Sequence, residues 1–136
     1  MSEIKVDNLT GKTSAGDITV TSEGGAATMQ LQQGLAKAWV NFNGTGTIAA
    51  RDSVNLSSLS DLNTGVYQIN FSNAFNNGNY ANVGSLGNAG RINPNDVLFI
   101  HPDNQNTTDS RVFNCLGNGG SADRVIVTCQ ITGDLA

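Results

Sequence analysis

One oxygen-rich stretch, residues 103–109 (DNQNTTD), holds the side chains best suited to clasp a cation. A calcium loop of the EF-hand kind alternates Asp and Asn ligands, has a Gly at its sixth position and ends on a Glu. This stretch has neither the Gly nor the Glu and directly follows Pro102, which is expected to end the apolar strand before it. A solvated loop is therefore the simpler interpretation. No metal ligand is assigned, and cation binding by this loop stays open.

The remaining reactive side chains form no recognisable catalytic set. His101 is the single histidine, and Cys115 and Cys129 are too far apart in the sequence for a zinc knuckle. No Gly-x-Ser-x-Gly elbow occurs, and glutamate is confined to Glu3 and Glu23. We expect His101 to be a polar residue at a strand end. The chain is predicted to have no catalytic residues and no cofactor, and not to be an enzyme.

The two cysteines are predicted to be free and buried. Both lie in apolar strand patterns, where Cys serves as a small core residue, and a reducing cytoplasm disfavours disulfides. A hairpin through residues 117–123 would put Cys115 opposite about Val125 and Cys129 opposite about Arg111. The thiols would then share a face without being opposed, too far apart for a disulfide.

Gly11-Lys12-Thr13 is similar to the end of a phosphate-binding loop, but that loop needs a Gly at position 6, which is Val. A simple turn explains these residues. The seven basic residues are spread singly and the net charge is −4, so nucleic acid is not an expected partner. The longest apolar run is far below the 18 or so residues that span a membrane. The first residues lack the basic and apolar regions of a signal peptide, which indicates synthesis in a cytoplasm.

The composition indicates β structure completed by neighbouring copies. Hydrophobic residues make up 38% and charged residues only 13% of the chain, which is rich in Asn, Ser, Thr and Gly. From residue 37 onward, short alternating runs are separated by Gly- and Asn-rich turns. Val40 and Phe42 share one strand face with Trp39 on the other, Val54 and Leu56 mark the next strand, and further strands are expected around the residues Tyr67, Ile69, Phe71, Tyr80, Val97, Ile100, Phe113, Val127 and Ile131. Seven or so such strands predict an all-β domain, a β-sandwich or jelly-roll-like fold, over residues 37–136.

Residues 1–36 are predicted to form an attachment arm with short strands. Their apolar residues are too few and too scattered to form a core, so order is expected to come from sister chains or from a docking partner. Residues 26–36 fit two patterns. Met29 and Leu31 alternate as in a strand, yet Leu35 and Trp39 have helical spacing, and strand is favoured because Gly34 would weaken a helix.

Several segments resemble tail-fibre and virion-appendage proteins of marine bacteriophages, including phages of cyanobacteria. The central one is LQQGLAKAWVNFNGTGTI at residues 31–48, followed by RDSVNLSSL at 51–59, GVYQINF at 65–71 and NYA at 79–81. The opening SEIKVDNL at residues 2–9 is similar to N-termini of the same group. After residue 84 the chain follows no pattern of that group.

The resemblance implies a structural virion protein, a homotrimer with an N-terminal attachment arm and an outward β-rich domain that serves in host attachment. The residues expected to contact other virion proteins or sister chains are Ile4, Val6, Leu9, Ile18, Val20, Trp39, Val40 and Phe42. A bacterial surface glycan is a further expected partner, and the loops that would contact it are unknown. Alternatives are a capsid decoration (cement) protein with a projecting knob and a soluble glycan-binding module, and nothing in the sequence separates tail from head.

Overall fold

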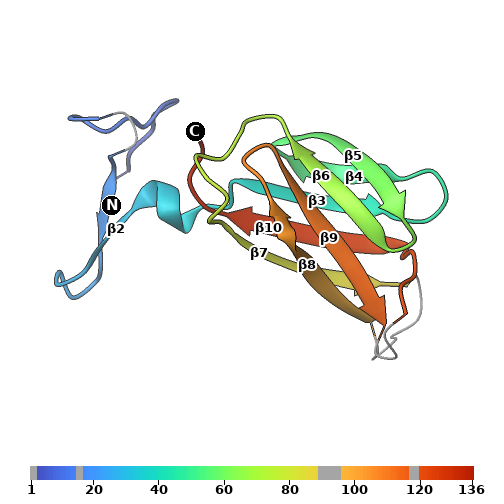
Figure 1. The fold of residues 1–136 in the computed structure, drawn as a ribbon. Helices are drawn as coiled ribbons and strands as arrows, with labels where there is room; N and C mark the ends of the chain where they lie inside the picture. Colours follow the sequence, from blue (N-terminus) through green and yellow to red (C-terminus); the bar gives the residue numbers. More distant parts are fainter. Residues whose placement is uncertain (1–2, 15–16, 89–95, 117–119) are drawn as a thin grey trace. The chain divides into compact units, whose positions relative to one another are not determined.

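A computed structural model describes residues 3–14, 17–88, 96–116 and 120–136. The chain divides into two compact units, Met1–Leu35 and Ala36–Ala136. The chain is all-β, as predicted (Figure 1). Among the described residues, no helix is long and apolar enough to cross a bilayer.

The first unit contains a two-stranded sheet and one helical turn. β1 (Thr19–Thr21) pairs antiparallel with β2 (Thr28–Gln30), and the chain reverses through Gly25 at a φ of 71°. The 3₁₀ helix η1 (Leu31–Gly34) follows directly. Residues 26–36 therefore contain both a strand and a helical turn, where strand alone was favoured. The 3₁₀ helix has only four residues and ends at Gly34, a residue that weakens a helix.

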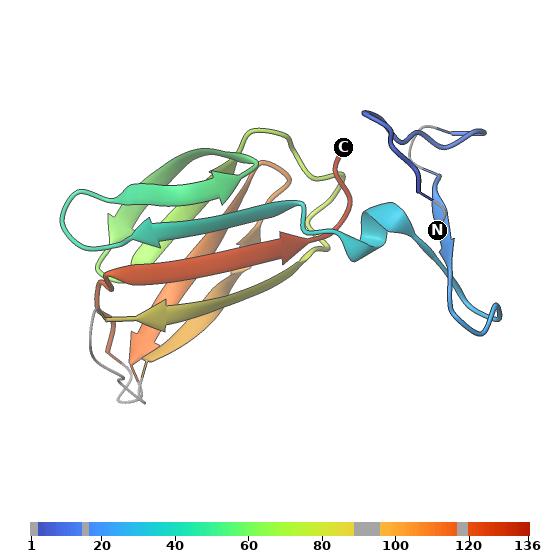
Figure 2. The same cartoon turned by 180° about the vertical axis from the view of Figure 1, so that it is seen from behind.

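The second unit is a β-sandwich, which confirms the predicted fold class. One sheet has the order β4-β3-β10-β7 and the other β5-β6-β9-β8. The strands are β3 (Ala38–Asn43), β4 (Ala49–Val54), β5 (Leu56–Asn63), β6 (Val66–Phe71), β7 (Ala81–Gly87), β8 (Asp96–Gln105), β9 (Asp109–Leu116) and β10 (Ile126–Thr132). In Figure 2 the teal, red and olive strands of the first sheet lie in front of the orange strands of the second.

The core lies between the sheets and follows from strand alternation. β3 and β6 bury every second residue, so Val40 and Phe42 face Tyr67 and Ile69 across the sandwich. Phe42 and Tyr67 pack edge to face with ring centroids 5.1 Å apart. Among the residues whose side chains are described, the buried apolar ones are Ala38, Val40, Phe42, Tyr67, Ile69, Phe71, Phe75, Tyr80, Val112, Val127, Cys129 and Ile131.

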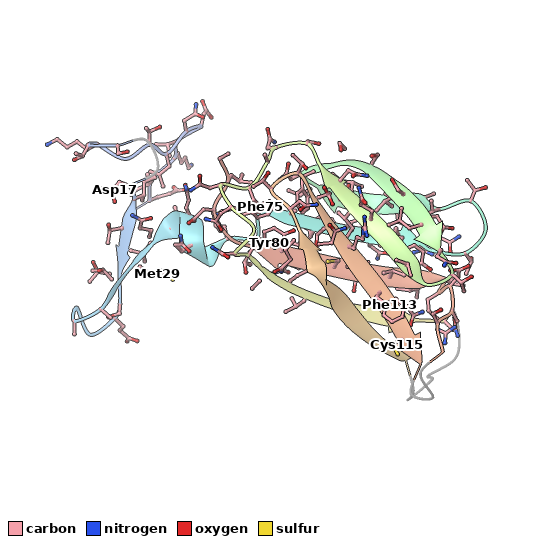
Figure 3. All side chains as sticks on the ribbon, in the orientation of Figure 1. Asp17, Met29, Phe75, Tyr80, Phe113 and Cys115 are labelled. Atoms are coloured by element: carbon pink, nitrogen blue, oxygen red, sulfur yellow. The ribbon has the colours of Figure 1, made fainter. Side chains whose placement is uncertain are left out.

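Aromatic packing closes one end of this core. Phe75 lies 4.8 Å from Phe71 and 4.7 Å from Tyr80, measured between ring centroids. Figure 3 shows Phe75 and Tyr80 at this end and Phe113 and Cys115 on β9 toward the other end. The Tyr80 hydroxyl donates to the backbone oxygens of Asn106 and Asp109 at 3.2 and 3.0 Å. The segment joining β6 to β7 is thereby fixed against the β8–β9 turn.

Two details of the predicted strands are corrected. Val54 and Leu56 do not share a strand, because Asn55 adopts a φ of 57° and the chain there leaves one sheet for the other. β8 runs through Pro102 to Gln105, and the register with β9 shifts between Ile100 and Gln105. A proline is tolerated there because β8 is an edge strand.

The predicted hairpin between Cys115 and Cys129 is also wrong. β9 pairs with β6 and β8, whereas β10 pairs with β3 and β7 in the other sheet. Both thiols are free, as predicted. Cys129 is buried, but Cys115 is only half-buried, because Val112 and Asn114 take the inward positions of β9.

Candidate functional site

The outer face of sheet β4-β3-β10-β7 presents side chains opposite to the core residues. Since Val40 and Cys129 point inward, their neighbours Trp39 and Gln130 point outward. The register places Gln130 between Trp39 and Val83, and Trp39 in turn beside Val54. The result is a row across all four strands, with Val54 47% and Val83 63% exposed at its two ends.

A cavity of about 460 Å³ opens on this face. Its lining comes from the three strands β3, β10 and β7, and consists of Trp39, Val40, Asn41, Val83, Gly84, Thr128, Cys129 and Gln130. Within the described part of the chain, neither the indole N–H of Trp39 nor the amide of Gln130 has a hydrogen-bond partner. The broad apolar ring of Trp39 and the free side-chain amide of Gln130 are therefore presented together, which is the chemistry of a binding surface.

The next row of the same face is polar and internally bonded. The hydroxyls of Ser85 and Thr128 lie 2.7 Å apart. Arg51, at the β4 bulge, donates to the side-chain oxygen of Asn41 at 3.1 Å and to the Val125 carbonyl at 2.5 Å. These bonds fix the polar side chains that border the cavity.

Beneath the cavity, a partly buried chain of polar side chains joins the two sheets. The Cys129 thiol donates to the Asn82 side-chain oxygen at 2.6 Å, and the Asn82 amide donates to the fully buried Ser110 hydroxyl at 3.1 Å. Burial raises the pKa of the Cys129 thiol to about 12, and its hydrogen bond with Asn82 offsets this rise only in part. The thiol is thus a protonated structural donor and not a nucleophile.

A second polar cluster anchors the segment that leads into β10. The Tyr67 hydroxyl lies 3.0 Å from both the Gly44 carbonyl and the Asp123 carboxylate, which also accepts from the Gly65 N–H at 2.7 Å. Burial, followed by the hydrogen bond and charge of Asp123, raises the pKa of Tyr67. The buried Asn114 amide donates to the Ala122 carbonyl. These bonds tie two turns to the sandwich and leave the phenol neutral.

The first unit offers a different surface, made of exposed apolar side chains. Ile4 is 85% exposed, Val6 and Leu9 are each 60% exposed, and Val20 is 44% exposed, while Ile18 is half-buried. Every residue of both strands of its small sheet is exposed. None of the described residues from 3 to 14 and from 17 to 35 is buried.

The structure separates the eight residues that were predicted to make intermolecular contacts. Six of them are available at the surface of one of the two units, and two are not. Ile4, Val6, Leu9, Ile18 and Val20 lie in the first unit, and Trp39 lies at the cavity of the second. Val40 and Phe42 are only 2% and 0% exposed, because their own sandwich already buries them. Their assignment to an intermolecular contact is therefore wrong.

The oxygen-rich stretch 103–109 forms the hairpin between β8 and β9. The Asn106 amide donates to both Asp109 carboxylate oxygens at 3.2 Å, and the Thr108 hydroxyl donates to one of them at 3.2 Å. No group of three His, Cys, Asp or Glu side chains that could hold a metal occurs among the described residues. The side chains of His101 and Asp103 lie outside the described residues.

Sequence reasoning missed Gln130, Thr128 and Val83 as neighbours of Trp39. Alternation within each strand signals which residues point outward with Trp39. Strand order is the missing information, because β10 pairs with β3 across about 90 residues of sequence.

Comparisons with protein-family models, with curated proteins and with solved structures give no match to this chain.

Proposed function

We propose that this chain is a structural virion protein, a homotrimeric tail fibre or fibre-like appendage of a bacteriophage that serves in host attachment. Its first unit attaches to sister chains and other virion proteins, and its sandwich is the outward domain. The phage setting and the threefold count are supported by the resemblance of residues 2–9 and 31–83 to virion-appendage proteins. The division of labour between the units is supported by their burial.

The observation that carries the proposal is that the first unit has apolar side chains but no buried residue in its described part. Burial of apolar surface contributes about 25 cal/mol per Å² removed from water, and an isolated two-stranded hairpin is marginal at best. Ile4, Val6 and Leu9 gain this stabilisation only against another surface. The sandwich needs no such help, because twelve apolar residues of its described part are buried together in one core.

Incorporation into particles tests the proposal. Val20→Asp places a charge on β1 that would be buried at the contact, so occupancy on particles should fall by at least tenfold. Thr21→Asp is the matched control, since it adds the same charge to an exposed neighbour on β1. Gold-labelled antibody then locates the protein. Tail labelling supports the fibre, head labelling supports the decoration protein, and unlabelled particles contradict both.

A second candidate function, a glycan-binding module, is favoured by the cavity at Trp39. A half-buried indole bordered by Gln130, Asn41 and Thr128 matches a sugar, which offers an apolar ring face and hydroxyls. Trp39 is the only tryptophan, so its fluorescence reports this cavity alone. Titration with dextran and with chitohexaose should then give a saturable change that Gln130→Ala abolishes and Gln68→Ala, in the other sheet, preserves. A flat titration with both sugars counts against this candidate.

A further inference from the structure

The sandwich has four edge strands, and three of them carry features that block pairing with another chain. β4 contains a bulge and the charged residues Arg51 and Asp52. β5 contains two register shifts and Asp61. β8 contains Pro102, which has no N–H to donate, and a register shift. Charges, prolines and bulges are the devices by which natural edge strands avoid adding a further strand.

β7 carries none of these devices. Its sequence, ANVGSLG, has no charged residue and no proline. It pairs with β10 through seven consecutive residues without a register shift. Ala81, Val83, Gly84 and Ser85 are exposed along it. A regular, neutral, exposed edge of this length is a template for a fifth strand, since among the described strands none pairs with its outward N–H and C=O groups in this sheet.

The chain itself contains a segment that fits this edge. In the six-residue segment Ile4–Leu9, which is close to the seven residues of β7 in length, Ile4 and Val6 alternate with Lys5 and Asp7, and Leu9 has the opposite parity. They are exposed and belong to no strand in the structure of one chain. An added strand places its side chains beside those of the edge strand, on the same alternating faces. Ile4 and Val6 share one such face, and either would cover part of the exposed Val83.

We propose that β7 accepts the segment Ile4–Leu9 of a second copy of this chain as a fifth strand of the sheet. The inference rests on the proposed function, because it names the surface through which the copies associate. The donor segment and the acceptor edge are different parts of the chain, so the contact is heterologous. A heterologous contact forms a ring when the rotation between copies closes and an open filament when it does not. Three copies that exchange one segment each in a closed ring make a trimer.

Paired substitutions in the full-length protein test the acceptor edge. Val83→Lys puts a charge where the added strand would dock, and Val54→Lys is its matched control at the other end of the same row, on the already blocked β4. Light scattering at micromolar concentration should give a multiple of 14.2 kDa for the wild type and for Val54→Lys. Val83→Lys should give 14.2 kDa with unchanged circular dichroism.

Cysteine cross-linking of mixed copies tests the donor segment. Copies carrying Ile4→Cys or Val6→Cys are mixed with copies carrying Val83→Cys and oxidised, so that any new disulfide joins two chains. A covalent dimer absent from the wild type, which has its own Cys115 and Cys129, is expected for at least one mixture. Failure of both mixtures overturns the proposal. A chain that carries both cysteines, one in the donor segment and one at position 83, also tests the proposal. If it forms only a disulfide within one chain, the proposal is overturned.

The outcomes also separate this inference from the proposed function. One outcome is that Val83→Lys keeps the mass of the wild-type oligomer while removal of residues 1–25 gives a monomer. In that case the first unit assembles the protein through another surface, and only the β7 proposal is wrong. If the wild type is a monomer at micromolar concentration, both fall.

Discussion

Two glycines with nearly the same backbone conformation show how the two units differ. Gly25 in the first unit has a φ of 71° and Gly65 in the sandwich a φ of 70°. A methyl group added to Gly25 would meet nothing within 4 Å, whereas one added to Gly65 would lie 3.0 to 3.1 Å from backbone atoms of Ala122 and Asn114. The same kind of turn is therefore free-standing in one unit and enclosed by packing in the other.

The contrast extends to apolar side chains that alternate along a segment of each unit. Ile4 and Val6 are 85% and 60% exposed, while Val40 and Phe42 are 2% and 0% exposed. Hydrogen-bonded strands are present in both units, so strand formation alone does not distinguish them. What distinguishes them is a second layer, because only the sandwich has a facing sheet to cover its apolar side chains.

The largest difference is expected from truncating one apolar side chain in each unit. Phe42→Ala removes a ring packed against Tyr67 and should cost about 3–5 kcal/mol of unfolding free energy. Ile4→Ala should change that free energy by less than about 0.5 kcal/mol, since the side chain is exposed. Urea unfolding followed by the fluorescence of Trp39, which lies in the sandwich, measures both. Equal losses of unfolding free energy in the two variants would contradict the proposed difference between the units.

Alkaline pH is expected to weaken only the sandwich. Burial raises the pKa of Cys129 from 9.0 to about 12, and that of Tyr67 also rises from 10.0. Because the folded state holds these protons more tightly, the associated stability is fully present below about pH 9 and is lost as pH rises through the raised pKa values. The urea midpoint should therefore fall from about pH 9 upward. Tyr67→Phe should flatten the decline above about pH 10, and a midpoint unchanged to about pH 11 would contradict this account.

The strands of the sandwich were largely readable from the sequence, because a half-buried strand alternates. Tyr67, Ile69 and Phe71 have the predicted parity, as do Val127, Cys129 and Ile131. The same rule misassigned β9, where Asn114 is buried and Phe113 is not. Asn114 takes the inward place because its amide is hydrogen-bonded to the Ala122 carbonyl, a contact with a connecting segment that local pattern does not reveal.

The cavity and the open edge could not be read in the same way. Trp39 was singled out, but its neighbours Gln130 and Val83 come from strands far along the chain. Strand order depends on which pairings bury the most apolar surface together, which is a property of the whole fold. Val40 and Phe42 were misassigned for the same reason. Their alternation indicated that they would be buried, but not whether their own sandwich or another chain would bury them.

A smaller contrast is expected when each positive-φ glycine is replaced by alanine. Both substitutions carry the cost of a left-handed residue, about 1–2 kcal/mol. Gly65→Ala adds the close contacts with Ala122 and Asn114, so the unfolding free energy of the sandwich should fall by about 2–3 kcal/mol. Gly25→Ala should leave the unfolding seen at Trp39 unchanged. A shift with Gly25→Ala would show that the two units unfold together.

The smallest effect is expected from the largest deletion. Removal of residues 1–25 leaves the sandwich sequence complete, since the twelve apolar residues found buried in the described part of the chain all lie at Ala38 or beyond. The first backbone bond of the sandwich, from Lys37 N–H to the Ile131 carbonyl at 2.8 Å, is also retained. At submicromolar concentration, where association contributes little, the free energy of unfolding should change by less than about 0.5 kcal/mol. At micromolar concentration the same variant should have the mass of a monomer. A loss above about 2 kcal/mol at the lower concentration would mean that the first unit is part of the sandwich's own stability, and the attachment role assigned to its exposed apolar side chains would then be wrong.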